Sequence, residues 1–521
     1  MKKILFLLFL PILSLAEGID EKIDMAFAPI SSFFSSVVFF TVYGIPFVLI
    51  LLVFSALFFT IYFGFPNIKY FKIAINTVRG KYDHIDNHES SSNVTDVKGT
   101  IKDESQEGEV SHFQALATAV SGTVGNGNIA GVALAIALGG PGATFWMIVC
   151  GLLGMSTKFV ECTLGVQYRD IGEDGTVYGG PMYYISKGLK EKGFGILAKI
   201  SSVLFAIFCI GGSFGGGNAA QSNQATIVLK DLLGLESTAS GAIIGCVIAA
   251  IVGVIIIGGI KRIATVTEKV VPFMAVMYLV ACLYIILTNF SFLDDAFQLI
   301  ISEAFNPTAM GVGSVIGVLL VGFKRAAFSN EAGAGSASIA HSAVKTKYSA
   351  SEGLVALLEP FIDTVVICTM TALVIIIFNF GGYFEYGGDG LGTVYIEGIA
   401  YEGAGITSQA FAQYIPFSNI FLTIAVVLFA VSTMISWSYY GLQSWKFIFG
   451  RGFLADLTYK ILFLIFIVIG AASSMKSIWD FSDAMIFAMI FPNMIGLFFL
   501  FPTVKRELQK YLSAIKGDLK K

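Results

Sequence analysis

Long apolar runs, separated by short polar segments, extend along most of the chain. Each run is about 20 residues long, which is enough to cross the hydrocarbon core of a bilayer as a helix. The runs occupy residues 38–63, 113–138, 142–166, 196–228, 240–259, 269–288, 309–340, 353–379, 417–444, 456–472 and 478–501. The pattern predicts an all-α polytopic membrane protein with about 11 transmembrane helices.

Composition agrees with a membrane protein and excludes several other classes. Of the 521 residues, 55% are hydrophobic and only 13% are charged, compared with about 25% charged in soluble proteins. The formal net charge of −3 offers no basic face for nucleic acid. The six cysteines stand singly in apolar runs and the chain has four histidines, so we expect neither a disulfide scaffold nor a zinc site.

The N-terminus and the loop charges predict an orientation. Residues 1–16 combine Lys2 and Lys3 with an apolar run and a small-residue end, as in a secretory signal peptide, with an uncleaved start as the alternative. Lys and Arg gather in residues 65–82, 167–199, 260–269 and 445–460 and in the basic tail 503–521, whereas 289–309 and 380–416 are acidic. Because basic segments stay inside, we expect the mature N-terminus outside the cell membrane and the C-terminus in the cytoplasm.

Residues 83–109 differ from the rest of the chain. They carry eight acidic residues against Lys98 and Lys102, together with Ser, Asn and His. Low hydrophobicity with an excess of one charge predicts a disordered cytoplasmic loop after the first span.

Two of the predicted spans have polar and glycine-rich middles. Residues 122–131 read GTVGNGNIAG, and residues 322–338 read GFKRAAFSNEAGAGSAS. Peptide groups exposed inside a bilayer are costly unless they line a polar cavity, so both helices are expected to break around a site. Tight packing through the GxxxG pair Gly127 and Gly131 is the alternative for the first segment, and a span that ends near Gly322 is the alternative for the second.

The spacing of the two breaks indicates function. Each opens a block of five spans, 113–288 and 309–501, and an odd number of spans inserts the second block upside down. Inverted repeats with broken first helices are typical of secondary transporters, and the span at 38–63 is then an additional first helix. An enzyme is not expected, because no nucleophile–base or metal motif accompanies the spans. A channel would ordinarily need an oligomeric selectivity ring instead.

Six ordered motifs resemble those of one known family. They are GTVGNGNIAGVA at 122–133, GGPG at 139–142, GMSTKFVE at 154–161, GGPMYYI at 179–185, FSNEAGAGS at 328–336 and STMISWSYYG at 432–441. Together they resemble the alanine/glycine:cation symporter family, the sodium:alanine symporters. The resemblance implies the leucine-transporter-like fold of five-plus-five inverted repeats. It also implies import of alanine or glycine with Na⁺ as the coupling ion and no other cofactor. Asn126, where Thr is commoner, and the acidic insertion depart from the family pattern.

The resemblance also implies where the substrate binds. The family's substrate contacts match Thr123 and Gly127 on the first break, Gln221 on the third repeat helix, and the run Phe328, Ser329, Asn330 and Glu331 on the second break. Hydroxyl and amide groups suit a zwitterion, and glycine lets the backbone approach it. For Gln221, an ordinary interhelical hydrogen bond is the alternative.

Beside the substrate site, we expect a cation site and a bulky side chain that limits the size of the substrate. Ser432 and Thr433 are adjacent hydroxyls in the span 417–444, and the resemblance pairs them with backbone carbonyls of Ser121 and Val124 to hold Na⁺. The alternative is a hydroxyl bonded within its own helix. Trp437 follows Thr433 by one turn and therefore shares its face, which predicts a wall that keeps the substrate small. A membrane-interface anchor is the alternative for Trp437.

Two further expectations concern charged residues within the spans. Coupling to protons instead of Na⁺ is the alternative mechanism, and Glu331, Glu359 or Asp363 would then relay the proton. Lys158 and Glu161 lie three residues apart in one span and are expected to form an ion pair.

Overall fold

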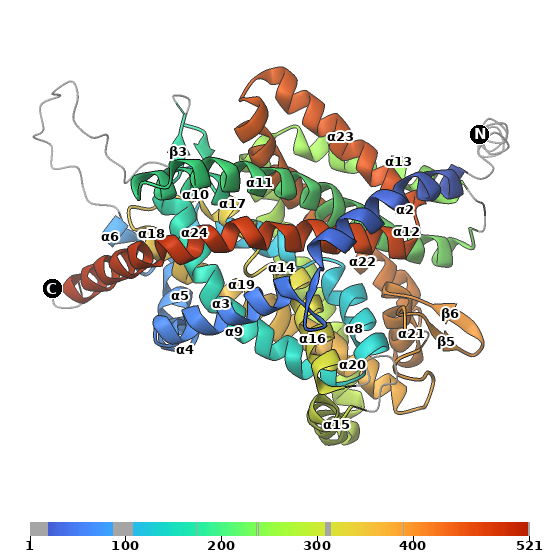
Figure 1. Ribbon diagram of the computed structural model, residues 1–521. Coiled ribbons are helices and arrows are strands. Elements are labelled where there is room, and N and C mark those ends of the chain that lie inside the picture. Colours follow the sequence, from blue (N-terminus) through green and yellow to red (C-terminus); the bar gives the residue numbers. More distant parts are fainter. Residues whose placement is uncertain are drawn as a thin grey trace, which may run out of the picture.

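The computed structural model describes residues 19–86, 108–172, 175–235, 237, 239–307, 314–388 and 390–518, almost all of them in helices (Figure 1). Within these residues, seven helices are long and apolar enough to cross a membrane, and a pair bent by 51° forms an eighth span. Two shorter apolar helices, Phe47–Tyr62 and Ser240–Ile256, accompany them. The predicted all-α polytopic class is confirmed. The predicted signal peptide, residues 1–16, and most of the acidic loop, residues 83–109, lie outside the described residues.

The N-terminal region differs from the predicted span 38–63. Helix α2 (Ile19–Val38) is followed by a hairpin of β1 (Thr41–Val42) and β2 (Ile45–Pro46), and α3 (Phe47–Tyr62) begins only after it. Tyr43 and Gly44 have φ angles of 52° and 81°, which a helix cannot accommodate, so the apolar run is split there. Helix α2 packs along α24 (Met475–Asp518), and Ser31 donates a hydrogen bond of 2.7 Å to the Ser477 carbonyl.

Short helices replace part of the expected loop after α3. They are α4 (Pro66–Lys69), α5 (Phe71–Val78) and α6 (Asp83–Asp86). Their basic residues Lys69, Lys72 and Arg79 come from the segment expected to face the cytoplasm.

Within the first predicted block of five spans, the described helices begin with a broken one. Its first helix consists of α7 (His112–Thr123), the π-helix η2 (Gly127–Gly131) and α8 (Val132–Gly139). Then follow α9 (Gly142–Gln167), the hairpin β3 (Asp170–Ile171) and β4 (Val177–Tyr178), α10 (Pro181–Glu191), α11 (Gly195–Phe214), the π-helix η3 (Gly215–Ala219), α12 (Ala220–Leu233), α13 (Ser240–Ile256) and α14 (Gly259–Thr288). A capping box fixes the start of α7, because Ser111 and Gln114 each accept a backbone N–H of the other.

The second block begins after η4 (Phe290–Phe292) and α15 (Leu293–Phe305) with a second broken helix, α16 (Val315–Asn330) and α17 (Ala337–His341). Next come α18 (Ser349–Ala356), α19 (Leu358–Pro360), the π-helix η5 (Phe361–Cys368), α20 (Thr369–Asn379), the hairpin β5 (Val394–Ile396) and β6 (Ile399–Tyr401), α21 (Ala404–Tyr414), α22 (Ser418–Phe449) and α23 (Phe453–Ala472). Helix α24 crosses the whole molecule (Figure 1). It continues through the predicted tail 503–521 as far as Asp518.

A chain of buried charged groups joins α9 to α7 and to the segments after the second break. Lys158 Nζ lies 3.0 Å from Glu359 Oε1, and both side chains are fully buried. His341 lies 3.5 Å from Glu359 and 2.5 Å from Glu352, which also contacts His112. The expected pair of Lys158 with Glu161 is therefore wrong. Glu161 instead accepts a hydrogen bond of 2.7 Å from Asn493 on α24.

Removing one member of the Lys158–Glu359 pair should destabilise the fold. Lys158→Met leaves the buried Glu359 carboxylate with only His341 beside it, and breaking a buried ion pair costs about 3–5 kcal/mol. We expect a clear drop in apparent melting temperature in detergent. Lys476→Met is the matched control, because Lys476 is exposed in its pair with Asp480. Equal melting temperatures for the two variants would contradict the importance of the buried pair.

Candidate functional site

Side chains from the broken helix itself and from α12 pair the backbone of the first break. Between α7 and η2, the amide of Gly125 donates to Asn128 Oδ1 at 2.8 Å, and the amide of Asn126 donates to Gln221 Oε1 at 2.9 Å. The Gln221 amide group donates in turn to the carbonyl of Gly216 on η3. Gln221 of α12 therefore stabilises the break. It forms the interhelical hydrogen bonds that the alternative interpretation expected.

The second break is held in the same way. Helix α16 ends where Glu331 takes the left-handed conformation with φ 55°. Asn330 donates to Thr364 at 3.0 Å, and Ser329 donates to Asp363 at 3.1 Å, both on η5. Asn128 of the first break also donates to Asp363 Oδ1, at 2.6 Å. One carboxylate on η5 thus joins the two broken helices.

Both breaks meet at one small cavity. Its volume is about 10 Å³, room for about one water molecule, and its walls are formed by Gly122, Thr123, Gly127, Gly216, Gln221, Phe328, Glu331, Thr433, Trp437 and Ile486. The structure therefore brings together six of the eight residues predicted to bind substrate, with Thr433 of the predicted cation site beside them. The other two, Ser329 and Asn330, form hydrogen bonds to η5 behind this wall.

The sequence interpretation missed Gly122, Gly216 and Ile486 as lining residues, although Gly122 opens the predicted break. Gly216 belongs to the run of three glycines, 215–217, in the middle of the predicted span 196–228, which was a usable signal. That run forms the π-helix η3, a distortion that is frequent at functional sites. Ile486 lies in an ordinary apolar stretch of α24 and carries no such signal.

Thr433 lies where the cation site was predicted. Its hydroxyl donates to the carbonyl of Ser121 at 3.0 Å and approaches that of Val124 at 3.5 Å, at the end of α7. These three oxygen atoms could serve as ligands for a cation, since the C-terminal end of a helix carries partial negative charge. Ser432 is placed differently. Its hydroxyl donates to Phe429 of its own helix and contacts Met274, whereas its carbonyl accepts from Ser121.

Trp437 is buried in the protein and is only 1% exposed. Its indole N–H donates to Glu331 Oε1 at 2.9 Å, and the Ser336 hydroxyl donates to the other carboxylate oxygen. Gly217 lies against the ring, where an added Cβ would be 2.1 Å from Trp437 Cγ. Packing against η3 therefore fixes the indole at the cavity wall rather than at a membrane interface.

The three candidate proton relays occupy different surroundings. Glu359 is paired with Lys158, and Asp363 accepts hydrogen bonds from Asn128, Ser329 and Thr364. Of the three, Glu331 is the one that lines the central cavity.

Comparisons with known proteins agree with this architecture. A sequence model of the sodium:alanine symporter family matches residues 30–521. The sodium/alanine symporter AgcS of Methanococcus maripaludis is 37% identical over 476 residues, which cover 91% of this chain and 96% of that protein. The probable sodium/glutamine symporter GlnT of Bacillus subtilis is 33% identical over 403 residues, or 77% of this chain and 78% of that protein.

Among solved structures, MhsT in complex with L-phenylalanine matches with a TM-score of 0.50 at 12% identity, covering 77% of this chain and 99% of that chain. At this identity the likeness concerns the fold alone, which is that of the leucine-transporter-like proteins.

The close packing at the first break predicts that replacing Gly125 by a larger residue lowers the stability of the protein. A Cβ at this position would lie 2.4 Å from Thr433 Oγ1 and 3.0 Å from Gln221 Oε1. We expect Gly125→Ala to lower the apparent melting temperature in detergent, and an added Thr433→Ala to restore part of it. In Gly131→Ala, the control, the nearest atom would be at 3.5 Å. If the Gly131 variant were the less stable of the two, the described packing would be incorrect.

Proposed function

This chain belongs to the sodium:alanine symporter family, and from that premise we propose that it imports a small neutral amino acid, alanine or glycine, together with Na⁺. It is a multi-pass membrane transporter and not an enzyme. The observation that carries the proposal is the convergence of both broken helices on one small cavity, with the Thr433 hydroxyl and two α7 carbonyl oxygens beside it.

The groups that line the cavity suit a zwitterion. Gly127 lines it at the start of η2, where the N-terminal end of a half-helix favours a carboxylate. The Glu331 carboxylate lies on the wall from the second break and can pair with an ammonium group. We assign Thr123 as a further hydrogen-bonding group. Gln221 positions the Asn126 amide, and Ser329 and Asn330 support the second break from behind.

Size selection follows from the same walls. Phe328, Trp437 and Ile486 enclose the cavity with rigid or bulky side chains. The Trp437 ring cannot retreat toward η3, since Gly217 already contacts it. Because so little space lies between these walls, they need to move apart less to admit a methyl side chain or a hydrogen than to admit a long side chain.

For the coupling ion, we propose a Na⁺ site formed by the carbonyls of Ser121 and Val124 and the hydroxyl of Thr433, with Ser432 fixing the approach of α7 through its carbonyl. Proton coupling is the second candidate, because Glu331 lines the cavity where a substrate would bind. With either ion, alternating access would expose the cavity first to one side of the membrane and then to the other.

The orientation is part of the proposal. Basic residues of the segments after α3, of 445–460 and of the end of α24 favour the cytoplasm, and the acidic segment 380–416 favours the outside. We therefore place the protein in the cell membrane with the mature N-terminus outside and the C-terminus in the cytoplasm.

Imposed ion gradients separate the two coupling mechanisms. A membrane potential favours inward movement of one Na⁺ by about 2.3 kcal/mol per 100 mV, roughly 50-fold accumulation of a zwitterion. In proteoliposomes at fixed pH, we expect an inward Na⁺ gradient to drive uptake of labelled alanine and the potential to increase it. Uptake driven by a proton gradient without Na⁺ would establish proton coupling instead.

Substituting Thr433 tests the cation site. Thr433→Ala removes one of three oxygen ligands, so we expect the Na⁺ concentration for half-maximal transport to rise about tenfold. The alanine dependence at saturating Na⁺ should change little. Thr433→Ser keeps the hydroxyl and serves as the matched control. An unchanged Na⁺ dependence in the alanine variant would move the cation elsewhere.

Shortening Trp437 tests the size filter. Trp437→Ala enlarges the cavity and removes the hydrogen bond to Glu331, so we expect weaker alanine binding and new competition by valine and leucine. Trp445→Ala is the control, because Trp445 lies on the same helix but packs at a tilt against Phe449 and Tyr459 and does not line the cavity. Competition assays showing the wild-type size limit in Trp437→Ala would exclude the wall role.

A further inference from the structure

The buried chain of charged side chains on one side of the cavity contains a histidine between two carboxylates. His341 Nδ1 lies 2.5 Å from Glu352 Oε1, and the other ring nitrogen, Nε2, lies 3.5 Å from Glu359 Oε2. Within the described part of the chain, Nε2 and Glu359 Oε2 form no hydrogen bond with any other atom. A neutral imidazole carries a hydrogen on only one nitrogen, so its second nitrogen would turn a lone pair toward a carboxylate. The arrangement is attractive only when His341 carries a proton on both nitrogens and is a cation.

The charges of this chain also balance only in that form. Glu352 and Glu359 supply two negative charges, and Lys158, 3.0 Å from Glu359, supplies one positive charge. His341 supplies the second, since His112 needs only the hydrogen on Nδ1 for its contact with Glu352. All five side chains are more than nine-tenths buried. Loss of the His341 proton therefore leaves one uncompensated negative charge in the protein interior, which is costly.

Other titratable side chains surround this chain on α9, α10, α22 and the second break. They are Glu161, Cys162, Tyr184, Tyr440 and Glu331. Thiols and phenols are uncharged near neutral pH. The two carboxylates accept hydrogen bonds from neutral donors, so they can only add negative charge to the region. They strengthen the requirement for a proton on His341.

The chain approaches the surface at His112. This side chain is 9% exposed and lines a surface pocket of about 350 Å³ together with Thr77 of α5, Asp83 and Lys345. Helix α5 belongs to the basic segment 65–82, so under the proposed orientation the pocket faces the cytoplasm. His112 is also the first residue of α7, which leads to the first break. Separation of α7 from α17 and α18 would therefore admit cytoplasmic water to the charged chain.

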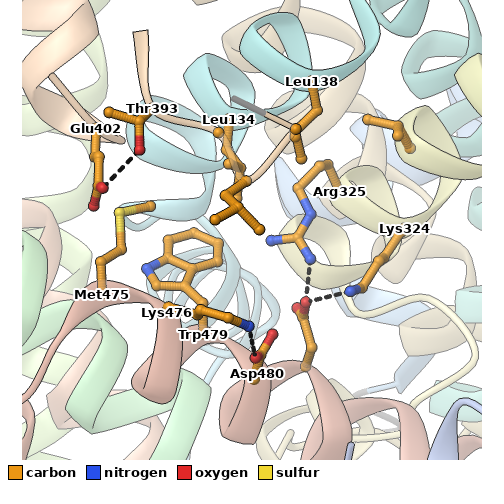
Figure 2. Close-up of a pocket in the computed structure, with 15 residues that line it drawn as sticks. Leu134, Leu138, Lys324, Arg325, Thr393, Glu402, Met475, Lys476, Trp479 and Asp480 are labelled. Atoms are coloured by element: carbon orange, nitrogen blue, oxygen red, sulfur yellow. Dashed lines mark hydrogen bonds and ion pairs between the residues drawn. The ribbon is translucent and has the colours of Figure 1, made fainter. Parts of the chain in front are cut away.

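The ion pairs on the opposite side of the cavity have a different composition. Figure 2 shows Lys324 and Arg325 of α16 pointing to one carboxylate, which belongs to Asp483 of α24. These pairs include no imidazole, the side chain that gains and loses its charge near neutral pH. A change of pH in this range therefore acts on one side of the cavity and not on the other.

We propose that the chain formed by His112, Glu352, His341, Glu359 and Lys158 senses the pH of the cytoplasm and closes the path from the central cavity to that side when it is protonated. In the closed arrangement, two carboxylates hold the proton of His341. In an open arrangement water surrounds the ring, and an imidazole in water releases its proton near about pH 6.5. Because the closed arrangement holds the proton more firmly, acidification favours closure and a rise in pH favours opening.

This sensor goes beyond the proposed import and does not depend on the coupling ion. Its assignment to the cytoplasm rests on the orientation proposed above. Under that orientation, an acidic cytoplasm slows the release of substrate, because the path must open before the substrate can leave.

Two backbone hydrogen bonds report the opening. The amide of Glu109 donates to the Ala343 carbonyl at 2.7 Å, and the amide of Lys345 donates to the Val110 carbonyl at 2.8 Å. Both bonds join the start of α7 to the segment after α17, so separation of the two exposes both amides to water. Hydrogen–deuterium exchange of these amides in the purified full-length protein therefore measures the opening equilibrium.

We expect this equilibrium to shift toward opening as the pH rises. After correction for the intrinsic pH dependence of exchange, release of one proton should raise the opening constant by up to about tenfold per pH unit, and by at least about tenfold between pH 6.5 and 8.5. Peptides from α23 are the internal control, because this helix packs against α12, α13 and α22 and not against the charged chain. Their corrected exchange should not change.

Three variants identify the group that titrates. Glu352→Gln keeps the size of the side chain but removes one negative charge, so Lys158 alone balances Glu359 and the pH dependence should disappear. His341→Gln cannot take up the proton, so it should be open at every pH. His112→Asn is the matched control, since its amide can donate to Glu352 while His341 stays between its carboxylates. The pH dependence should remain in this variant.

Corrected exchange of Glu109 and Lys345 that is independent of pH in the wild type would overturn the proposal. So would an unchanged pH dependence in Glu352→Gln or in His341→Gln, and either variant decides if the other does not fold. The measurement needs no substrate, so its failure leaves the proposed transport function intact, and an absence of alanine transport leaves the sensor intact.

Discussion

A helix that breaks inside a bilayer must find new partners for its peptide groups, because each unpaired group costs several kcal/mol there. The site of this protein is arranged around that constraint. At the first break, the Asn128 side chain accepts the Gly125 amide and Gln221 accepts the Asn126 amide, while Thr433 donates to the Ser121 carbonyl at the end of α7. Each partner comes from a different place, namely η2, α12 and α22, so the break fixes how these helices surround the cavity. The groups that pair the peptide groups of the break also form the polar surface that could bind a zwitterion.

Ion pairs lie on two sides of the cavity, and they must be separated before the cavity can open to either side. On one side, Lys158, Glu359, His341, Glu352 and His112 form a buried chain between α9, α17, α18, α19 and α7. On the other, Asp483 of α24 holds Lys324 and Arg325 of α16. Separating buried charges without new partners is strongly unfavourable, so either path can open only when water or a ligand replaces the lost contacts.

The sequence predicted the breaks and most of the cavity residues because those features are local. Glycine and asparagine in the middle of an apolar run show where a helix cannot continue, and a one-turn spacing puts Trp437 beside Thr433. Partners distant in sequence were not predictable in this way. Glu359 lies 201 residues from Lys158, and Asp483 lies 158 residues from Arg325, so the expected neighbour Glu161 was chosen wrongly. The sequence pattern did not predict helix α2, because Asp20, Glu21 and Pro29 interrupt its apolar residues. Its apolar face is apparent only from its packing against α24.

Thr433 shows how a cation could link the two halves of the transporter. The hydroxyl belongs to α22 in the second block, and the carbonyls of Ser121 and Val124 belong to α7 in the first, so their contact crosses the interface between the blocks. A hydroxyl has one donor and two acceptor positions. Without a cation, its hydrogen bridges the blocks by donating to a carbonyl. With a cation between the three oxygens, the hydroxyl must rotate so that a lone pair faces the ion. The ion then replaces a weak neutral hydrogen bond with attraction to all three oxygen atoms. Binding of the ion would thereby strengthen the contact between α7 and α22 next to the substrate cavity, which is the physical requirement for coupling ion and substrate binding.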